Sequence, residues 1–230
     1  MKPEIFDLFP LSVFKDKILL QPNEKQEIFE YIFDMEKKTE NLDKRKYDAW
    51  LGDTKGHEFI LKNPKMHHLA TLIGEKIKAY TAMLSIENKK IDFFYQRSWA
   101  TITRKKERIH VHSHDQSNIS FAYYPLKPEN SGNISFLVEP PQNEIASGLL
   151  HQEKKDIGLL KNFNKRNAPT VDIHINEDDI VIFPSKTKHA TIPNPTNDPR
   201  ISISGDVTIM LKDSFGHERL MPHYNNWQSF

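Results

Sequence analysis

Two different spacings of apolar residues divide the chain near residue 90. In the first part, apolar residues recur every three or four positions, which is the period of a helix with one buried face. One such segment follows Pro22 and another follows Pro64. The second is marked by Met66, Leu69, Ile73, Ile77, Tyr80 and Leu84. The pattern predicts two helices that pack against the rest of the fold.

From Ile91 the period changes to two, the spacing of side chains that share one face of a β-strand. Short segments rich in β-branched and aromatic residues alternate with turn residues. They span 91–103, 108–114, 118–126, 133–140, 170–176, 179–184, 189–193 and 200–211. Because no long helix separates them, the pattern predicts an antiparallel sandwich or jelly roll. The expected fold class is α+β, mainly β, with supporting helices at the N-terminus.

A chain of 230 residues has the length of one large domain, and we expect a single domain over 1–230. It divides into a helical N-terminal part (1–90), a jelly-roll core (91–211) and a C-terminal tail (212–230). Inside the core, residues 140–170 form a polar insertion with scattered leucines. Because long excursions from a compact domain are often functional, we expect this insertion to hold a short helix and to act as a lid.

Composition narrows the classes of function. Lys plus Arg (32) and Asp plus Glu (31) nearly balance at a net charge of +1, so no nucleic-acid partner is expected. The absence of cysteine excludes disulfides, thiol catalysis, zinc fingers and iron–sulfur clusters. Glu4 and Asp7 interrupt the segment where a signal peptide would be apolar. We expect a soluble, cytoplasmic protein with no membrane partner, and its excess of Lys over Arg fits an AT-rich genome of a phage or marine bacterium.

The candidate chemistry lies in the segment Ile109–His114, where every second residue is a histidine. On a strand, His110, His112 and His114 share one face, whereas Ile109 and Val111 point to the other. Neighbours on one face lie about 6.6 Å apart. Two imidazoles at that separation can converge on one metal ion.

Further candidates come from the later strands. His189 lies beyond a turn that follows an apolar strand. Arg200 opens another strand and shares a face with Ser202, so this face can hold a guanidinium that binds a carboxylate through two hydrogen bonds, assisted by a hydroxyl. Tyr124 shares a face with two small residues, which leave room for a ligand.

The combined pattern H-x-H…ISxxYY…FPSxxxH…RxS, on a jelly roll preceded by helices, resembles the Fe(II)- and 2-oxoglutarate-dependent oxygenases. The most similar branch is the prolyl-hydroxylase-like bacterial and phage family with an HxHP-type motif. That branch also has a phrase like LFPLSVF, here residues 8–14, and a Ser–Trp pair like Ser98–Trp99. The resemblance covers residues 5–211 and implies a double-stranded β-helix core, of the jelly-roll or cupin-like kind.

The same resemblance implies roles for individual residues. His112, His114 and His189 would occupy the positions of iron ligands, and Arg200 with Ser202 would bind the distal carboxylate of 2-oxoglutarate. Tyr124 would lie beside that co-substrate. The implied cofactors are Fe(II), 2-oxoglutarate and O2, with no catalytic residue beyond the metal centre.

The implied reaction is hydroxylation of an unactivated C–H bond, with release of succinate and CO2. The substrate class is an amino acid, a peptidyl group or a small molecule, and the pattern does not choose among them. A homodimer is also left open.

Two alternatives remain at this point. The usual first pair of the family is His-x-Asp, and Asp115, which replaces the proline of HxHP, would be a ligand if a bulge after Ser113 turned it inward. The two-residue spacing favours His114 instead. The second alternative is a cupin-like three-histidine metalloprotein without 2-oxoglutarate, either a dioxygenase, an isomerase or a binding module, although such a site has no need of Arg200.

Overall fold

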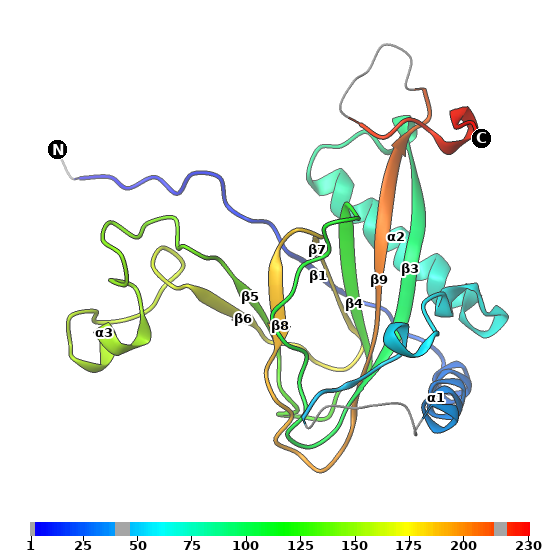
Figure 1. Ribbon diagram of the computed structural model, residues 1–230, viewed down its shortest axis with the longest axis horizontal. Helices are drawn as coiled ribbons and strands as arrows, with labels where there is room; N and C mark the ends of the chain where they lie inside the picture. The colour runs from blue at the N-terminus through cyan, green and yellow to red at the C-terminus, as the bar shows by residue number, and fades with distance from the viewer. Residues whose placement is uncertain (1–2, 40–46, 214–219) are drawn as a thin grey trace.

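The computed structural model describes residues 3–39, 47–213 and 220–230, and its centre is a pair of antiparallel sheets (Figure 1). The larger sheet has the strand order β1-β7-β4-β9-β3-β2, and the smaller has the order β6-β5-β8. The strands are β1 (Phe14–Lys17), β2 (Trp50–Leu51), β3 (Ile91–Thr103), β4 (Ile119–Leu126), β5 (Ile134–Leu137), β6 (Thr170–Ile173), β7 (Asp179–Pro184), β8 (Lys188–Thr191) and β9 (Arg200–Leu211).

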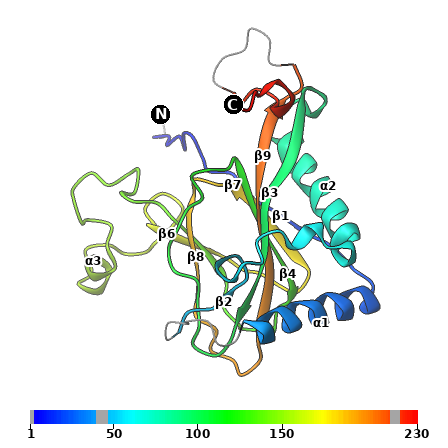
Figure 2. The same ribbon diagram turned by 45° about the vertical axis from the view of Figure 1, so that its right-hand side comes forward.

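Two helices, α1 (Pro22–Lys38) and α2 (His67–Met83), cover the outer face of the larger sheet (Figure 2). Ile32 of α1 and Ile73 of α2 are fully buried, and they share one apolar cluster with Ile201 and Ile203 of β9. Burial of each such side chain contributes roughly 1.5–3 kcal/mol to stability. Both helices that the apolar spacing predicts are present.

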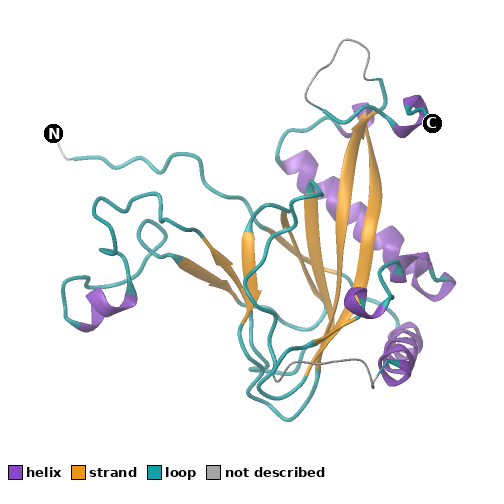
Figure 3. Ribbon diagram, in the orientation of Figure 1, coloured by secondary structure: helices purple, strands orange, loops and turns teal. Residues whose placement is uncertain are grey.

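Strand β4 shows how alternate residues separate the two cores. Phe121 and Tyr123 belong to the cluster under the helices, whereas Tyr124 belongs to a second cluster with Phe136 of β5 and Phe183 of β7. The rings of Phe136 and Phe183 lie 4.9 Å apart, so the inner faces of the two sheets pack on each other. The predicted jelly roll and the mainly β, α+β fold class are confirmed (Figure 3).

The predicted strand over 108–114 is wrong as a regular element, because it forms only isolated bridges, Arg108 with Asp48 and His112 with His189 of β8. His112 and His189 exchange backbone hydrogen bonds of 3.0 and 2.9 Å, and so extend the smaller sheet at its β8 edge. The chain then leaves that edge, and the His114 N–H donates to the carbonyl of Ser185, next to β7 (2.9 Å). The segment therefore crosses from one sheet to the other.

Residues 1–90, for which the sequence predicts helices alone, also supply β1 and β2. β2 pairs with β3, and the backbone of Ala49 just before it donates to the carbonyl of Arg108 (3.2 Å). This contact joins the edge of the larger sheet to the segment that carries the histidines. Short 3-10 turns cover Asp53–Lys55, Ile60–Lys62, Pro64–Met66, Asn88–Lys90 and Tyr224–Asn226.

The insertion 140–170 projects away from both sheets and carries the short helix α3 (Gln152–Asp156) (Figure 1). Asp7 of the N-terminal segment forms ion pairs of 2.7 Å with Lys165 and with Arg166 at its far end. The expected helix is present. Of the predicted tail, residues 214–219 lie outside the described part of the chain. Among the described helices, none is long and apolar enough to cross a lipid bilayer.

Candidate metal centre

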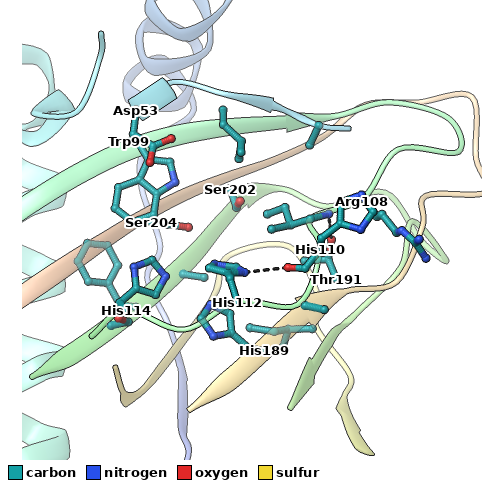
Figure 4. Close-up of a pocket in the computed structure, with 18 of the residues that line it drawn as sticks. Asp53, Trp99, Arg108, His110, His112, His114, His189, Thr191, Ser202 and Ser204 are labelled. Carbon is teal, nitrogen blue, oxygen red and sulfur yellow. Dashed lines mark hydrogen bonds between the residues drawn. The ribbon is translucent and has the colours of Figure 1, made fainter. Parts of the chain in front are cut away.

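Three histidines converge in the space between the two sheets (Figure 4). His112 comes from the bridge to β8, His114 from the crossing segment, and His189 from β8 itself. One ring nitrogen of each lies within 4.8 Å of those of the other two. The ring centroids are 5.0 Å apart for His112 and His114, 4.2 Å for His112 and His189, and 5.4 Å for His114 and His189.

The hydrogen bonds of these rings fix which nitrogen is free. Each Nδ1 lies against an acceptor: the carbonyl of His110 for His112 (2.8 Å), the carbonyl of Thr187 for His189 (2.9 Å), and Asp206 Oδ2 for His114 (3.1 Å). Since an acceptor requires a proton on Nδ1, the lone pair of each ring is on Nε2. Three Nε2 lone pairs in one cavity are the donor set of a divalent transition metal.

Burial keeps two of these rings neutral. It lowers the pKa of His189 to about 3, with the neighbouring His112 adding to the effect. It also lowers the pKa of His112. Because a metal binds the neutral imidazole, no proton has to leave these rings at neutral pH before the ion binds.

The carboxylate beside His114 is fully buried. Burial alone would raise the pKa of Asp206, but the hydrogen bond and charge of His114, together with the hydrogen bond from Ser120, hold it below the ordinary value. Ser120 Oγ lies 2.9 Å from Asp206 Oδ1. Asp206 is therefore a carboxylate anchored behind the ring of His114, on the same inward face of β9 as Arg200 and Ser202.

The other two candidates of the histidine segment lie elsewhere. Asp115 is exposed, and its Oδ1 accepts from Ser113 (3.3 Å). His110 is also exposed and contacts Asp48 (3.0 Å). Neither belongs to the group of potential ligands that the described residues bring together.

Arg200 is buried in the same barrel, with 2% of its surface exposed. Its Nη1 donates to the carbonyl of Ser131 (2.7 Å), but its Nη2 has no hydrogen-bond partner among the described residues. Burial lowers the pKa of this guanidinium, although it is still a cation at neutral pH. Because an unpaired buried cation costs several kcal/mol, the free Nη2 indicates a place for an anionic group.

A cavity of about 270 Å³ lies beside the three histidines. Ser202 and Tyr124 line it together with the three histidines, whereas Arg200 does not line it. Trp99 forms part of its wall and stacks on the ring of His114 at 5.6 Å. Asp48, Asp53, Arg108 and His110 add charged or titratable side chains to its lining. No lining residue comes from 140–170, so the lid stays a prediction.

Sequence reasoning overlooked Asp206, Asp53 and the contact of Trp99 with His114. The signal for Asp206 was present, because positions 200, 202, 204 and 206 share one face of a strand. Asp53 gave no signal, since it lies in a short 3-10 turn, where it pairs with Arg97 (2.9 Å).

Residues 97–206 match the family model described as "Putative 2OG-Fe(II) oxygenase". This stretch contains the three histidines, Arg200 and Asp206. Over these residues, a little less than half of its length, the chain is similar to the 2OG-Fe(II) oxygenase family. The finer resemblance to an HxHP-type branch stays a prediction. A search of curated proteins finds no match.

Several solved structures share the fold. The non-heme alpha ketoglutarate dependent carbocyclase SnoK from nogalamycin biosynthesis aligns at TM-score 0.55 and 11% identity, over 92% of this chain and 87% of that one. HygX from Streptomyces hygroscopicus, solved with nickel and 2-oxoglutarate bound, aligns at TM-score 0.53 and 10% identity, over 86% of this chain and 82% of that one. A Pseudomonas putida prolyl-4-hydroxylase aligns at TM-score 0.50 and 10% identity, over 85% of this chain and 92% of that one. The expected double-stranded β-helix is confirmed.

Proposed function

We propose that this protein is an Fe(II)- and 2-oxoglutarate-dependent hydroxylase. Its substrate is an amino acid, a peptidyl group or a small molecule with an unactivated C–H bond, and its co-products are succinate and CO2. The observation that carries the proposal is the coexistence of two features in one barrel. Three imidazoles present free Nε2 lone pairs, and a buried arginine keeps one unpaired N–H group.

His112, His114 and His189 fit Fe(II) as ligands. Three neutral nitrogen donors on one side of an ion leave other coordination positions open, as iron oxygenases require. When bound there, the iron with 2-oxoglutarate and O2 supplies an oxidant strong enough to replace C–H by C–OH. The residues of this chain hold that centre in place, because each ring is fixed through Nδ1 by a partner on the chain.

Arg200, Ser202 and Tyr124 fit the distal carboxylate of 2-oxoglutarate. The unpaired Nη2 of Arg200 is a charged donor that a carboxylate oxygen would satisfy. The hydroxyls of Ser202 and Tyr124 line the cavity and offer two further donors. The same free N–H group argues against a three-histidine cupin without 2-oxoglutarate. Such a protein would bind no anion here, and the buried guanidinium would keep an unpaired donor.

The apolar part of the cavity wall bears on where the reacting carbon would lie. Trp99, Phe183 and Ile134 are apolar and buried, so the reacting carbon would lie in a poorly hydrated space. The polar lining at Asp48, Asp53, Arg108 and His110 offers charges of both signs. A substrate that carries polar groups beside the reacting carbon fits this cavity.

The test is turnover of the purified protein. With Fe(II), ascorbate, O2 and 2-oxoglutarate, we expect succinate to form, and to form faster in the presence of a metabolite or peptide pool that contains the substrate. Mass spectrometry should then find a product heavier by one oxygen atom. Absence of succinate, with a metal bound, would reject the 2-oxoglutarate-dependent reaction.

A further inference from the structure

The three histidines are not held alike. The Nδ1 groups of His112 and His189 donate to backbone carbonyls, whereas that of His114 meets a carboxylate, Asp206. Asp206 is fully buried, and a buried carboxylate is costly unless its partners compensate for lost hydration. A neutral residue at position 206 would avoid this cost. The carboxylate must therefore have a role that a neutral side chain cannot fill.

The charge of the metal site explains why a carboxylate is present. Three neutral imidazoles add no negative charge, so a bound divalent ion would keep both of its positive charges in this partly buried site until the anionic co-substrate binds. Two carboxylates of the cavity lining already pair elsewhere, Asp48 with His110 and Asp53 with Arg97. Asp206 is the carboxylate that contacts a candidate ligand directly.

We propose that Asp206 is a positioning residue that holds His114 with Nε2 toward the metal and supplies, through this hydrogen bond, the negative charge that three neutral ligands lack. The inference rests on the proposed function. A hydrogen bond from a liganding imidazole to a carboxylate makes the ring a stronger donor to the metal, so the charge acts without a metal–oxygen bond.

The surroundings of Asp206 restrain it for this role. Ser120 Oγ lies 2.9 Å from Asp206 Oδ1 and also 2.9 Å from Ser185 Oγ. On the other side, the indole of Trp99 stacks on the ring of His114 with an interplanar angle of 25°. The carboxylate and the ring are thus each fixed by a second contact.

The test compares metal affinity in variants of the whole protein. In anaerobic titrations with Co(II), we expect Asp206→Asn to bind roughly 10- to 100-fold more weakly than the unchanged chain. Asp179→Asn is the matched control, because Asp179 is also buried but pairs with Lys15 (2.8 Å) and lies outside the cavity. It should bind Co(II) with unchanged affinity.

The same substitution in a His114→Asp variant distinguishes the loss of negative charge at the metal from a general structural effect. His114→Asp places a carboxylate at the ligand position itself, so Asp206→Asn should then cost less than about threefold in affinity. In the otherwise unchanged chain, Asp206→Asn should also raise the midpoint potential of the bound Fe(III)/Fe(II) couple, since lost negative charge favours Fe(II). If Asp206→Asn does not fold, Ser120→Ala, which frees one side of Asp206, should still weaken Co(II) binding severalfold.

The outcomes separate the two proposals. If the unchanged chain binds no Co(II) or Fe(II), the proposed metal centre fails, and this inference with it. If it binds the metal but Asp206→Asn, or Ser120→Ala in its place, keeps full affinity, only the role of Asp206 is overturned. Equal loss of affinity in both backgrounds, or an unchanged potential, would likewise overturn charge supply.

Discussion

At the scale of single residues, the unpaired Nη2 of Arg200 determines how co-substrate binding responds to mutation. Arg200→Ala should weaken 2-oxoglutarate binding by roughly 2–5 kcal/mol, because it removes a charged partner of a buried carboxylate. Arg200→Lys should restore only part of the affinity, since an ammonium group lacks the planar pair of N–H donors of a guanidinium. Calorimetry on the iron-loaded protein measures both. Arg166→Ala, at an exposed arginine paired with Asp7, is the control, and equal affinity of Arg200→Ala and this control would refute the role.

The choice between His114 and Asp115 is also a question of one residue. We expect His114→Ala to lose most of its bound iron, since it removes one of three nitrogen donors. Asp115→Ala should keep its iron, because Asp115 is exposed and contacts Ser113. Metal analysis after gel filtration decides the matter, and iron loss in the Asp115 variant alone would reverse the assignment.

Local spacing was enough to single out the histidine pair, because side chains two apart share a face in any extended segment. It was not enough to find Asp206, whose contact with His114 spans 92 positions of sequence and depends on how two sheets face each other. The one sequence feature that indicates Asp206 is a charged residue at a strand position that faces inward.

At the scale of elements, the turn before β5 shapes the surroundings of Arg200. Gly132 has a φ of +88°, and a Cβ there would lie 2.8 Å from Arg200 Nη1. Gly132→Ala should therefore both strain the turn and displace the guanidinium, so we expect lower stability and weaker 2-oxoglutarate binding.

Gly158 provides the matched control for this turn. Its φ is +79°, and a Cβ there would meet nothing within 4 Å. Gly158→Ala should cost about 1–2 kcal/mol of stability through backbone strain alone and leave 2-oxoglutarate binding unchanged. Urea unfolding and calorimetry measure the two effects, and an equal loss of binding in both variants would contradict the account.

Strands that alternate over their whole length were the elements that the sequence predicted well. β3 and β9 begin and end at the predicted residues, 91–103 and 200–211. β1 and β2 are only four and two residues long, too short for any period to appear. The segment 108–114 alternates yet crosses between sheets, because its hydrogen-bond partners change from β8 to Ser185.

At the scale of the whole molecule, burial of neutral histidine makes stability depend on pH. The folded pKa of His189, about 3, lies below the unfolded value of 6.5. Between these values the unfolded chain binds the proton more readily, so the metal-free protein loses stability as the pH falls below 6.5. The loss approaches about 1.4 kcal/mol per pH unit for this group.

Urea unfolding of the metal-free protein at pH 7 and pH 4.5 measures this dependence. His189→Gln, which cannot take up the proton, should lose roughly 2–3 kcal/mol less than the unchanged chain between these pH values. Groups that do not interact with His189 contribute equally to both proteins and cancel in the difference. The same slope in both would show that His189 is not buried as a neutral ring.

The central claim is that one barrel holds Fe(II) on three histidines and 2-oxoglutarate on Arg200. The most direct measurement is the visible absorption of the anaerobic iron-loaded protein on addition of 2-oxoglutarate. A keto acid that chelates Fe(II) produces a charge-transfer band. We expect this band in the unchanged chain, only at much higher 2-oxoglutarate in Arg200→Ala, and not in His189→Gln. Absence of the band in the iron-loaded unchanged chain, or its persistence in His189→Gln, would contradict the account.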